Sequence, residues 1–159
     1  MNIVALIPAR GGSKGIKNKN ITLVKNKPLI AHTIIVAKKC KLIDEIYVST
    51  DSEKIKKCSI KFGAKAPFSR PKNISRDRST DLQAMLHFNN WYLNFFKKRI
   101  DLIVHLSATT PFRKPKMIDK AISIMIKKSE YTSLRSFVET KLTPFKMWVK
   151  KNNRAIPII

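Results

Sequence analysis

A glycine-rich, cationic turn near the N-terminus carries the clearest chemical signal in the sequence. The turn reads Pro8-Ala9-Arg10-Gly11-Gly12-Ser13-Lys14-Gly15 and follows a short apolar run. Adjacent glycines let the backbone turn sharply and bring its N–H groups close to a ligand. Backbone donors and cations at the end of a strand suit a polyphosphate. Four cations lie in or just after the turn: Arg10, Lys14, Lys17 and Lys19.

The turn matches neither of the two common nucleotide-binding fingerprints. No Gly-Lys-Ser/Thr follows at the spacing of a Walker A motif, and the dinucleotide pattern G-x-G-x-x-G is absent. The alternative interpretation is an exposed, lysine-rich turn with no ligand. The elements around the turn must therefore decide between the two.

Length and composition predict one soluble domain of 159 residues, large enough to bury a core. No apolar run is long enough to span a membrane, and the N-terminus lacks the pattern of a signal peptide. The two cysteines, Cys40 and Cys58, match no metal or redox motif. We therefore expect two reduced thiols in a cytoplasmic protein with no membrane partner.

The formal net charge of +23 raises nucleic acid or an anionic surface as a partner. However, the lysines are spread along the chain, and Lys97-Lys98-Arg99 is the longest purely basic run. Lysine, isoleucine and asparagine all have A/T-rich codons, so mutational bias is an alternative source of the charge. We expect no dedicated nucleic-acid surface, although the charge attracts anionic substrates.

Hydrophobic patterns and breakers predict alternating strands and helices. Strands are predicted at 3–7, 45–50, 64–68, 101–106 and 131–138, and helices at 28–39, 53–62, 81–98 and 115–128. Asp51-Ser52 can cap the second helix, Gly63 ends it, and Ser79 or Thr80 can cap the third. This alternation is typical of an α/β sandwich with a mainly parallel sheet.

Three polar loops follow predicted strands, at 10–20, 51–52 and 107–113. In such sheets, ligands bind at the carboxyl ends of the strands. We therefore expect the three loops to meet in one crevice, which favours the phosphate-binding interpretation. His32, His87 and His105 are expected to be packing or surface residues, with His105 buried and lacking an acid–base partner.

A series of motifs resembles the N-acylneuraminate cytidylyltransferases, also called CMP-sialic acid synthetases. The first motif, Ile-Pro-Ala-Arg-Gly-Gly-Ser-Lys-Gly-Ile-x-x-Lys-Asn, spans 7–20. Further matches follow in the family's order at 28–30, 48–51, 62–64, 67–71, 79–81, 109–113 and 144–148. The resemblance thus covers nearly the whole chain.

The resemblance implies a three-layer α/β/α sandwich, the Rossmann-like fold of nucleotide-diphospho-sugar transferases. It also implies a reaction in which CTP and a nine-carbon 2-keto sugar acid give a CMP-sugar and pyrophosphate. Mg²⁺ would offset the charge of the triphosphate, and the full-length protein would form a homodimer. Catalysis would rest on alignment and electrostatic stabilisation.

The family's functional positions can be carried over to matching residues. By analogy, Arg10 and Lys14 would hold the triphosphate and stabilise charge as pyrophosphate leaves. Sugar-acid contacts would come from Ser107 and Thr109. The nucleotide-binding set implied by the resemblance is Arg10, Gly11, Gly12, Ser13, Lys14, Lys19, Asn20, Arg70, Ser79 and Asp81.

Three departures from the family pattern bear on these roles. Ser107 stands where the family often has glutamine, so its contact would be shorter and weaker. Asp81 stands where the family often has serine, and a carboxylate repels a triphosphate unless it binds metal or a sugar hydroxyl. Family members are longer, and the resemblance places a catalytic arginine, the Mg²⁺-binding aspartates and part of a dimer-forming arm beyond Ile159.

We therefore expect residues 1–159 to form a single nucleotidyltransferase domain, truncated at its C-terminus. No Asp-x-Asp pair occurs in the chain, so its metal ligands stay unassigned, with Asp51 and Asp81 as possible contributors. Two alternatives remain open. One is CMP transfer to legionaminic, pseudaminic or 3-deoxy-octulosonic acid, and the other is a non-catalytic basic fragment that binds nucleotides or nucleic acid.

Overall fold

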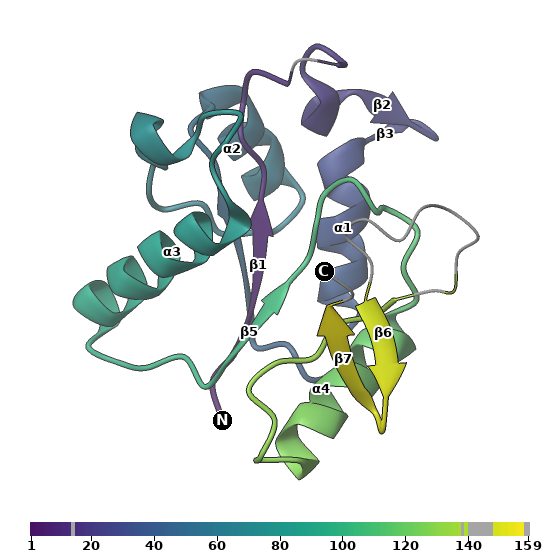
Figure 1. The fold of residues 1–159 in the computed structure, drawn as a ribbon. Coiled ribbons are helices and arrows are strands. Elements are labelled where there is room, and N and C mark those ends of the chain that lie inside the picture. Colours follow the sequence, from purple (N-terminus) through teal and green to yellow (C-terminus); the bar gives the residue numbers. More distant parts are fainter. Residues whose placement is uncertain (14, 138, 140–147, 158–159) are drawn as a thin grey trace.

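A three-stranded parallel sheet forms the centre of the molecule. The computed structural model describes residues 1–13, 15–137, 139 and 148–157. The sheet has the order β4-β1-β5, with β1 (Ile3–Pro8) between β4 (Glu45–Ser49) and β5 (Leu102–His105) (Figure 1). Ala5 of β1 lies opposite Ile46 on one side and Val104 on the other. The carboxyl ends of all three strands therefore lie at one edge of the sheet.

Helices cover both faces of this sheet. The α-helices of the described residues are α1 (Leu29–Lys38), α2 (Glu53–Lys61), α3 (Asp81–Phe96) and α4 (Pro115–Lys127), and short 3-10 helices lie at Lys19–Ile21 and Lys72–Ile74. In the described part of the chain, no helix combines the length and apolar character needed to cross a membrane. The predicted helix at 28–39 begins one residue later, because Pro28 belongs to a short strand.

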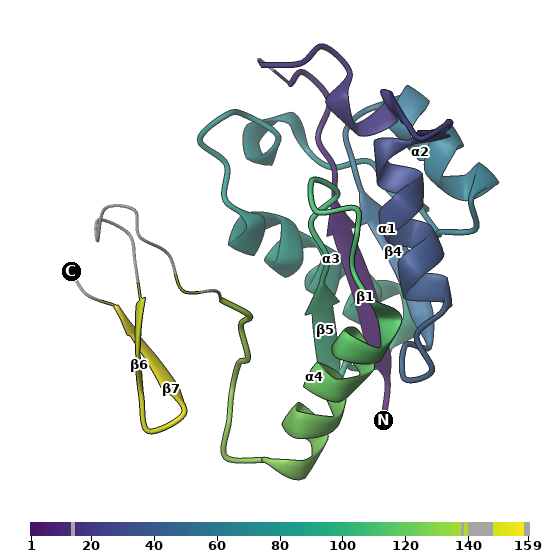
Figure 2. The ribbon, with the colours of Figure 1, turned by 90° about the vertical axis from the view of Figure 1, so that its right-hand side faces the viewer.

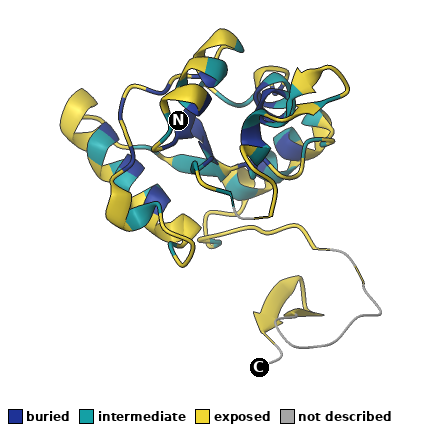
Figure 3. Cartoon of the chain, turned by 90° about the horizontal axis from the view of Figure 1, so that it is seen from above, coloured by how far each residue is buried: buried dark blue, intermediate teal, exposed yellow. Residues whose placement is uncertain are grey.

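Alternation along β1 divides the core into two parts. Ile3, Ala5 and Ile7 point to one face, where buried residues of α1, α2 and α4 pack against them. Val4 and Leu6 point to the other face, against α3. Side chains of successive strand residues alternate in this way. The α/β/α sandwich with a parallel sheet is thus confirmed, and dark-blue buried residues concentrate in these layers in Figure 3.

The ends of the helices follow the predicted signals in part. Thr80 caps α3 in a capping box, in which Gln83 N–H donates to the threonine hydroxyl and Gln83 Oε1 accepts from Thr80 N–H. Gly63 follows α2 with a φ of +94°, as a helix-ending glycine does. Ser52 is the N-cap residue of α2, but its side chain makes no capping bond. The predicted cap by Asp51 is wrong, because that carboxylate accepts the Gly11 N–H.

Two predicted strands differ in the structure. The strand predicted at 64–68 reduces to one bridge, in which Lys65 pairs with β4, because Pro67 has no N–H to continue the ladder. The strand predicted at 131–138 is wrong for 131–137, which are described without regular structure, and Val138 lies outside the described residues. A strand needs a neighbouring strand to accept and donate its backbone hydrogen bonds, and no strand in the described part of the chain pairs with 131–137.

Two antiparallel hairpins were not predicted. One joins β2 (Leu23–Val24) to β3 (Lys27–Pro28), and the other joins β6 (Trp148–Lys151) to β7 (Arg154–Pro157). The second lies to one side of the α/β layers in Figure 2, and all eight of its strand residues are exposed. Both central turn residues have positive φ, at 48° and 60° for Asn152 and Asn153. Asparagine favours such a turn, so this pair could have revealed the second hairpin.

Candidate functional site

A polar pocket of about 470 Å³ lies at the carboxyl edge of the sheet. Three loops build it, from the ends of β1 and β5 and from the segment that leads into α3. The loops at 10–20, 51–52 and 107–113 were predicted to meet in one crevice. The first and third do line the pocket, whereas the 51–52 loop does not line it and instead contacts the β1 loop through Asp51. The pocket lining is Pro8, Ala9, Arg10, Ser13, Gly15, Lys19, Asn20, Arg70, Asp77, Ser79, Thr80, Asp81, Ser107, Ala108 and Thr109.

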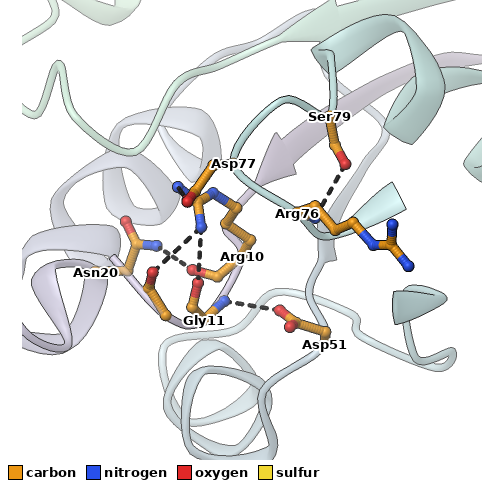
Figure 4. A network of polar contacts seen from close by, with 8 residues as sticks. Arg10, Gly11, Asn20, Asp51, Arg76, Asp77 and Ser79 are labelled. Atoms are coloured by element: carbon orange, nitrogen blue, oxygen red, sulfur yellow. Dashed lines mark hydrogen bonds and ion pairs between the residues drawn. The ribbon is translucent and has the colours of Figure 1, made fainter. Parts of the chain in front are cut away.

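Arg10 is the first cation after β1, and several contacts fix its position (Figure 4). Its guanidinium forms an ion pair with Asp77 at 2.8 Å and donates to the carbonyl of Gly12 at 3.2 Å. The Asn20 side-chain amide donates to the Arg10 carbonyl at 3.1 Å. Asn20 is itself buried, so the start of the turn is tied to the short helix at Lys19–Ile21.

The two glycines of the turn meet different constraints. The Gly11 N–H donates to Asp51 Oδ1 at 2.7 Å, which links the β1 loop to the β4 loop. A Cβ atom on Gly11 would lie 3.3 Å from the Ser52 Cβ, which is tighter than ordinary contact. Gly12 has a φ of +63°, a conformation that side chains of L-residues rarely adopt. Neither glycine lines the pocket, although both shape the turn that does.

Arg70 is a buried cation beside the pocket, with 6% of its surface exposed. Its Nε–H donates to Ser49 Oγ at 3.0 Å and its Nη2 donates to the Ser49 carbonyl at the end of β4. Burial lowers the pKa of Arg70, while the nearby carboxylates of Asp51 and Asp81 raise it. A guanidinium stays charged in proteins, so Arg70 is a fixed positive charge held by the sheet.

Asp81 has a partner that the sequence did not reveal. Its carboxylate lies 3.4 Å from His105 Nε2 at the end of β5. Partial desolvation of the ring lowers the pKa of His105, and Asp81 partly offsets that effect. Because His105 is an exposed residue with a carboxylate partner, the expectation of a buried, unpartnered His105 is wrong. Position 105 is the last of a short strand, where the side chain leaves the core and reaches the N-terminus of α3.

Ser107 and Thr109 lie together in the loop after β5. Ser107 Oγ is 2.8 Å from Thr109 Oγ1 and also accepts the Thr109 N–H at 3.3 Å. Arg113 braces this loop through its backbone, because the Arg113 Nη1 donates to the carbonyls of Ser107 and Thr110 at 2.9 and 2.6 Å. Arg113 was not predicted as a site residue, because its role depends on backbone carbonyls that the folded loop brings near it.

The remaining predicted site residues fall into two groups. Ser13, Lys19 and Ser79 line the pocket, and Ser79 Oγ accepts the Arg76 N–H at 3.0 Å (Figure 4). Lys14 lies outside the described residues, so its place in the site stays a prediction.

The described residues offer no ready-made metal cage. No three His, Cys, Asp or Glu side chains among them lie close enough to hold an ion. The two carboxylates that line the pocket are each paired with a cationic or titratable partner, Asp77 with Arg10 and Asp81 with His105. Mg²⁺ usually binds one or two carboxylates together with substrate phosphates. The two pocket carboxylates therefore suit a metal ion that is bound mainly by the phosphates of a nucleotide better than a metal ion held by protein ligands alone.

Comparison with known proteins places these features in a family. The family model described as Cytidylyltransferase matches residues 4–153. A CMP-N,N'-diacetyllegionaminic acid synthase from Legionella pneumophila is 39% identical over 126 residues, which cover 78% of this chain and 53% of that protein. N-acylneuraminate cytidylyltransferase A from Danio rerio is 36% identical over 137 residues, which cover 86% of this chain and 30% of that protein.

A solved structure supports the fold independently. The CMP:2-keto-3-deoxy-manno-octonic acid synthetase complexed with CTP superposes with a TM-score of 0.68 at 22% identity, over 81% of this chain and 49% of that one. The chain thus spans about half the length, or less, of the known proteins that it matches here. With its family model matched along nearly all of its residues, the chain belongs to the cytidylyltransferases.

Proposed function

We propose that this protein transfers CMP from CTP to a nine-carbon 2-keto sugar acid and releases pyrophosphate. The observation that carries the proposal is the pocket at the carboxyl edge of the sheet, which is lined by three cations, Arg10, Lys19 and Arg70. Fixed cations and backbone N–H groups suit a triphosphate. The relatives described above are named for CMP transfer to such acids.

The proposed reaction is an in-line displacement at the α-phosphorus. The anomeric hydroxyl oxygen of the sugar acid forms a bond to that phosphorus and loses its proton to solvent, while the bond to the pyrophosphate oxygen breaks. Arg10, Lys14 and Lys19 would hold the triphosphate and offset the charge that develops on the leaving pyrophosphate. Arg70, fixed by Ser49, would keep its charge in place without reorganisation.

Gly11, Gly12, Ser13, Asn20, Ser79 and Asp81 complete the proposed nucleotide site. Ser107 and Thr109 face the same pocket from the β5 loop and would contact the sugar acid. We propose that Mg²⁺ enters with CTP and offsets charge on the triphosphate, because the described residues alone do not gather a ligand set.

The acid that is activated is proposed to be an N-acylneuraminate or a related nonulosonate. The relative matched at 39% identity is named for a legionaminic acid derivative, and the one at 36% for N-acylneuraminate. Pseudaminic and 3-deoxy-octulosonic acids are alternatives with the same reacting group. We place the reaction in the cytoplasm, since Cys40 and Cys58 are both free thiols.

Two measurements test the proposal. Calorimetry should show that CTP binds more tightly than ATP, GTP or UTP, and pyrophosphate release should require CTP together with one acid of a panel. Lys14→Ala should lower turnover by orders of magnitude if Lys14 meets the developing charge. Turnover within a few-fold of the parent would remove Lys14 from the mechanism.

The alternative of a basic binding protein gives a different outcome. In that case the chain would release no pyrophosphate with any acid and would bind RNA tightly, with an affinity that falls steeply as salt rises. That pair of results would overturn the enzymatic proposal.

A further inference from the structure

The segment between α2 and α3 carries Arg70, and its backbone is bound to the sheet side at two points. Lys65 pairs with β4, and the Arg70 N–H donates to the Thr50 carbonyl at 2.8 Å. Between these two points lies the ring of Phe68, which is buried. A group that packs against Phe68 therefore helps to set the position of Arg70, which follows two residues later.

Helix α3 contacts Phe68 with three rings of its own. The centroid of the Phe68 ring lies 4.9 Å from that of Trp91 and 5.4 Å from that of His87. The Phe88 ring lies between them in the sequence and is 6.0 Å away. His87 and Trp91 are four residues apart, so they lie one helical turn from each other on the same face of α3. A regular helix thus supports Phe68 from the side opposite the sheet.

His87 differs from the other two rings because the charge of Arg70 acts on it. Burial lowers the pKa of His87, and the positive charge of Arg70 lowers it further. The imidazole is therefore neutral at pH 7 and does not repel the guanidinium. Its Nδ1 atom is buried and has no hydrogen-bond partner among the described residues. Packing of the ring against Phe68, and not a hydrogen bond at Nδ1, thus holds His87 in place.

We propose that His87 is a positioning residue for Arg70, because its ring braces Phe68 and so keeps the Arg70 guanidinium in place at the pocket. On the other side, the Ser49 hydroxyl and carbonyl accept hydrogen bonds from that guanidinium. The inference rests on the proposed function, in which Arg70 lines the nucleotide site. His87 does not line the pocket itself, so it acts through Arg70 and not on the ligand.

A guanidinium that is already held in place does not have to reorganise when an anionic ligand binds. If the His87 ring is removed, Phe68 loses one of its supports and Arg70 can leave its position. The loss should then appear both in the free protein, as a less protected guanidinium, and in the complex, as weaker binding. A residue that only fills space in the core would affect stability without affecting Arg70 selectively.

Hydrogen exchange at Arg70 tests the proposal without any ligand. The Arg70 Nε–H is buried and donates to Ser49 Oγ at 3.0 Å, so NMR should show slow exchange of this hydrogen with water. His87→Ala should speed the exchange about tenfold or more. His87→Gln, which keeps the length of the side chain but not the ring, should act in the same direction. His87→Phe restores a ring and should return the exchange to within about twofold of the parent.

Phe96→Ala is the matched control for loss of a ring from α3. Its described ring contacts are to other members of the helix: Trp91, Tyr92 and Phe95. The control should leave exchange at Arg70 unchanged. Faster exchange in Phe96→Ala than in His87→Ala would overturn the proposal, since loosening of α3 as a whole would then explain the effect.

Calorimetric titration with CTP tests the consequence for binding. His87→Ala should raise the Kd for CTP by about three- to tenfold, the size expected for one ring contact, and His87→Phe should restore the affinity. In a chain with Arg70→Gln, His87→Ala should have no further effect, because His87 acts through Arg70. An equal effect with and without Arg70, or a His87→Phe variant as weak as His87→Ala, overturns the proposal.

The two measurements separate this inference from the proposed function. A parent chain that does not bind CTP, but whose Arg70 exchange responds to His87→Ala, overturns the nucleotide site and supports the positioning of Arg70. A parent chain that binds CTP, with both exchange and affinity unchanged in His87→Ala, overturns the positioning role and supports the nucleotide site.

Discussion

Both carboxylates that line the pocket are paired with a neighbouring arginine or histidine, so a bound anion must compete with Asp77 for Arg10. Arg10, which would hold the triphosphate, forms its ion pair with Asp77 at 2.8 Å. Asp81, which also lines the pocket, forms a second pair with His105. The sequence identified Arg10 and Asp81 as site residues but not their partners, because Asp77 and His105 come close only in the folded chain.

Replacing Asp77 by asparagine should tighten CTP binding. The change removes a negative charge that competes with the triphosphate for Arg10, and an exposed ion pair of this kind contributes up to about 1 kcal/mol, or roughly fivefold in Kd. Calorimetric titration with CTP measures the effect. Glu130→Gln is the control, since it removes the same charge from a surface pair with Lys128. Weaker CTP binding in Asp77→Asn would instead mean that Asp77 positions Arg10 for the ligand.

Arg113 offers a separate residue-level prediction. Its guanidinium donates to two carbonyls of the Ser107–Thr110 loop, and burial lowers its pKa without removing its charge. Arg113→Ala should raise KM for the sugar acid about tenfold or more while CTP affinity changes little, because charged hydrogen bonds of this kind contribute about 1.5–3 kcal/mol each. Steady-state kinetics with each substrate varied in turn separate the two effects. Lys114→Ala, a change at the next residue, should alter neither, and an equal loss for both substrates would rule out a selective role for this loop.

At the level of elements, the sequence predicted the sheet and the four helices well. The apolar run at 3–7 and the helix signals at Thr80 and Gly63 depend on local chemistry, and the structure reproduces them. Segments whose structure depends on a distant partner were predicted poorly. Residues 64–68 form a single bridge and 131–137 form no strand, because neither pattern specifies which neighbouring strand would accept its backbone bonds.

The capping box at α3 gives a prediction for stability. Thr80→Ala removes the hydroxyl that accepts the Gln83 N–H and should lower the free energy of unfolding by about 1 kcal/mol. Chemical denaturation measures this loss. Ser52→Ala is the matched control, since Ser52 occupies the N-cap of α2 without a capping bond. The control should lose clearly less, and equal losses would show that the capping box adds nothing at α3.

The whole molecule is strongly basic, and the structure distributes that charge unevenly. Lysines cover α2 and α4, while α3 has none. Composition alone predicted an attraction for anions, but only the arrangement of the helices shows which surface lacks cations. The pocket itself combines Arg10, Lys19 and Arg70 with two carboxylates, so it depends on the surrounding field as well as on its own residues.

Raising the salt concentration should therefore weaken CTP binding. A net charge of +23 raises the local concentration of an anionic substrate, and added salt screens that field. We expect KM for CTP to increase several-fold between low and physiological ionic strength while kcat changes little. Binding of cytidine, which carries no phosphate, serves as the control and should be nearly independent of salt. A salt-independent KM would mean that only contacts inside the pocket attract the nucleotide.

The order of strands in the sheet has a consequence for synthesis of the protein. Of the three strands in the sheet, the central strand β1 is synthesised first, yet it pairs with β4 and β5, which come later in the chain. The later of these two strands, β5, ends at His105. At about 5–20 residues per second, the apolar sequence Ile3–Pro8 waits roughly 5–20 s before both of its edges can pair. During that interval the nascent chain exposes an unpaired apolar strand. Production of soluble protein should therefore depend on chaperones that bind nascent chains, and slower or cooler expression should improve the yield.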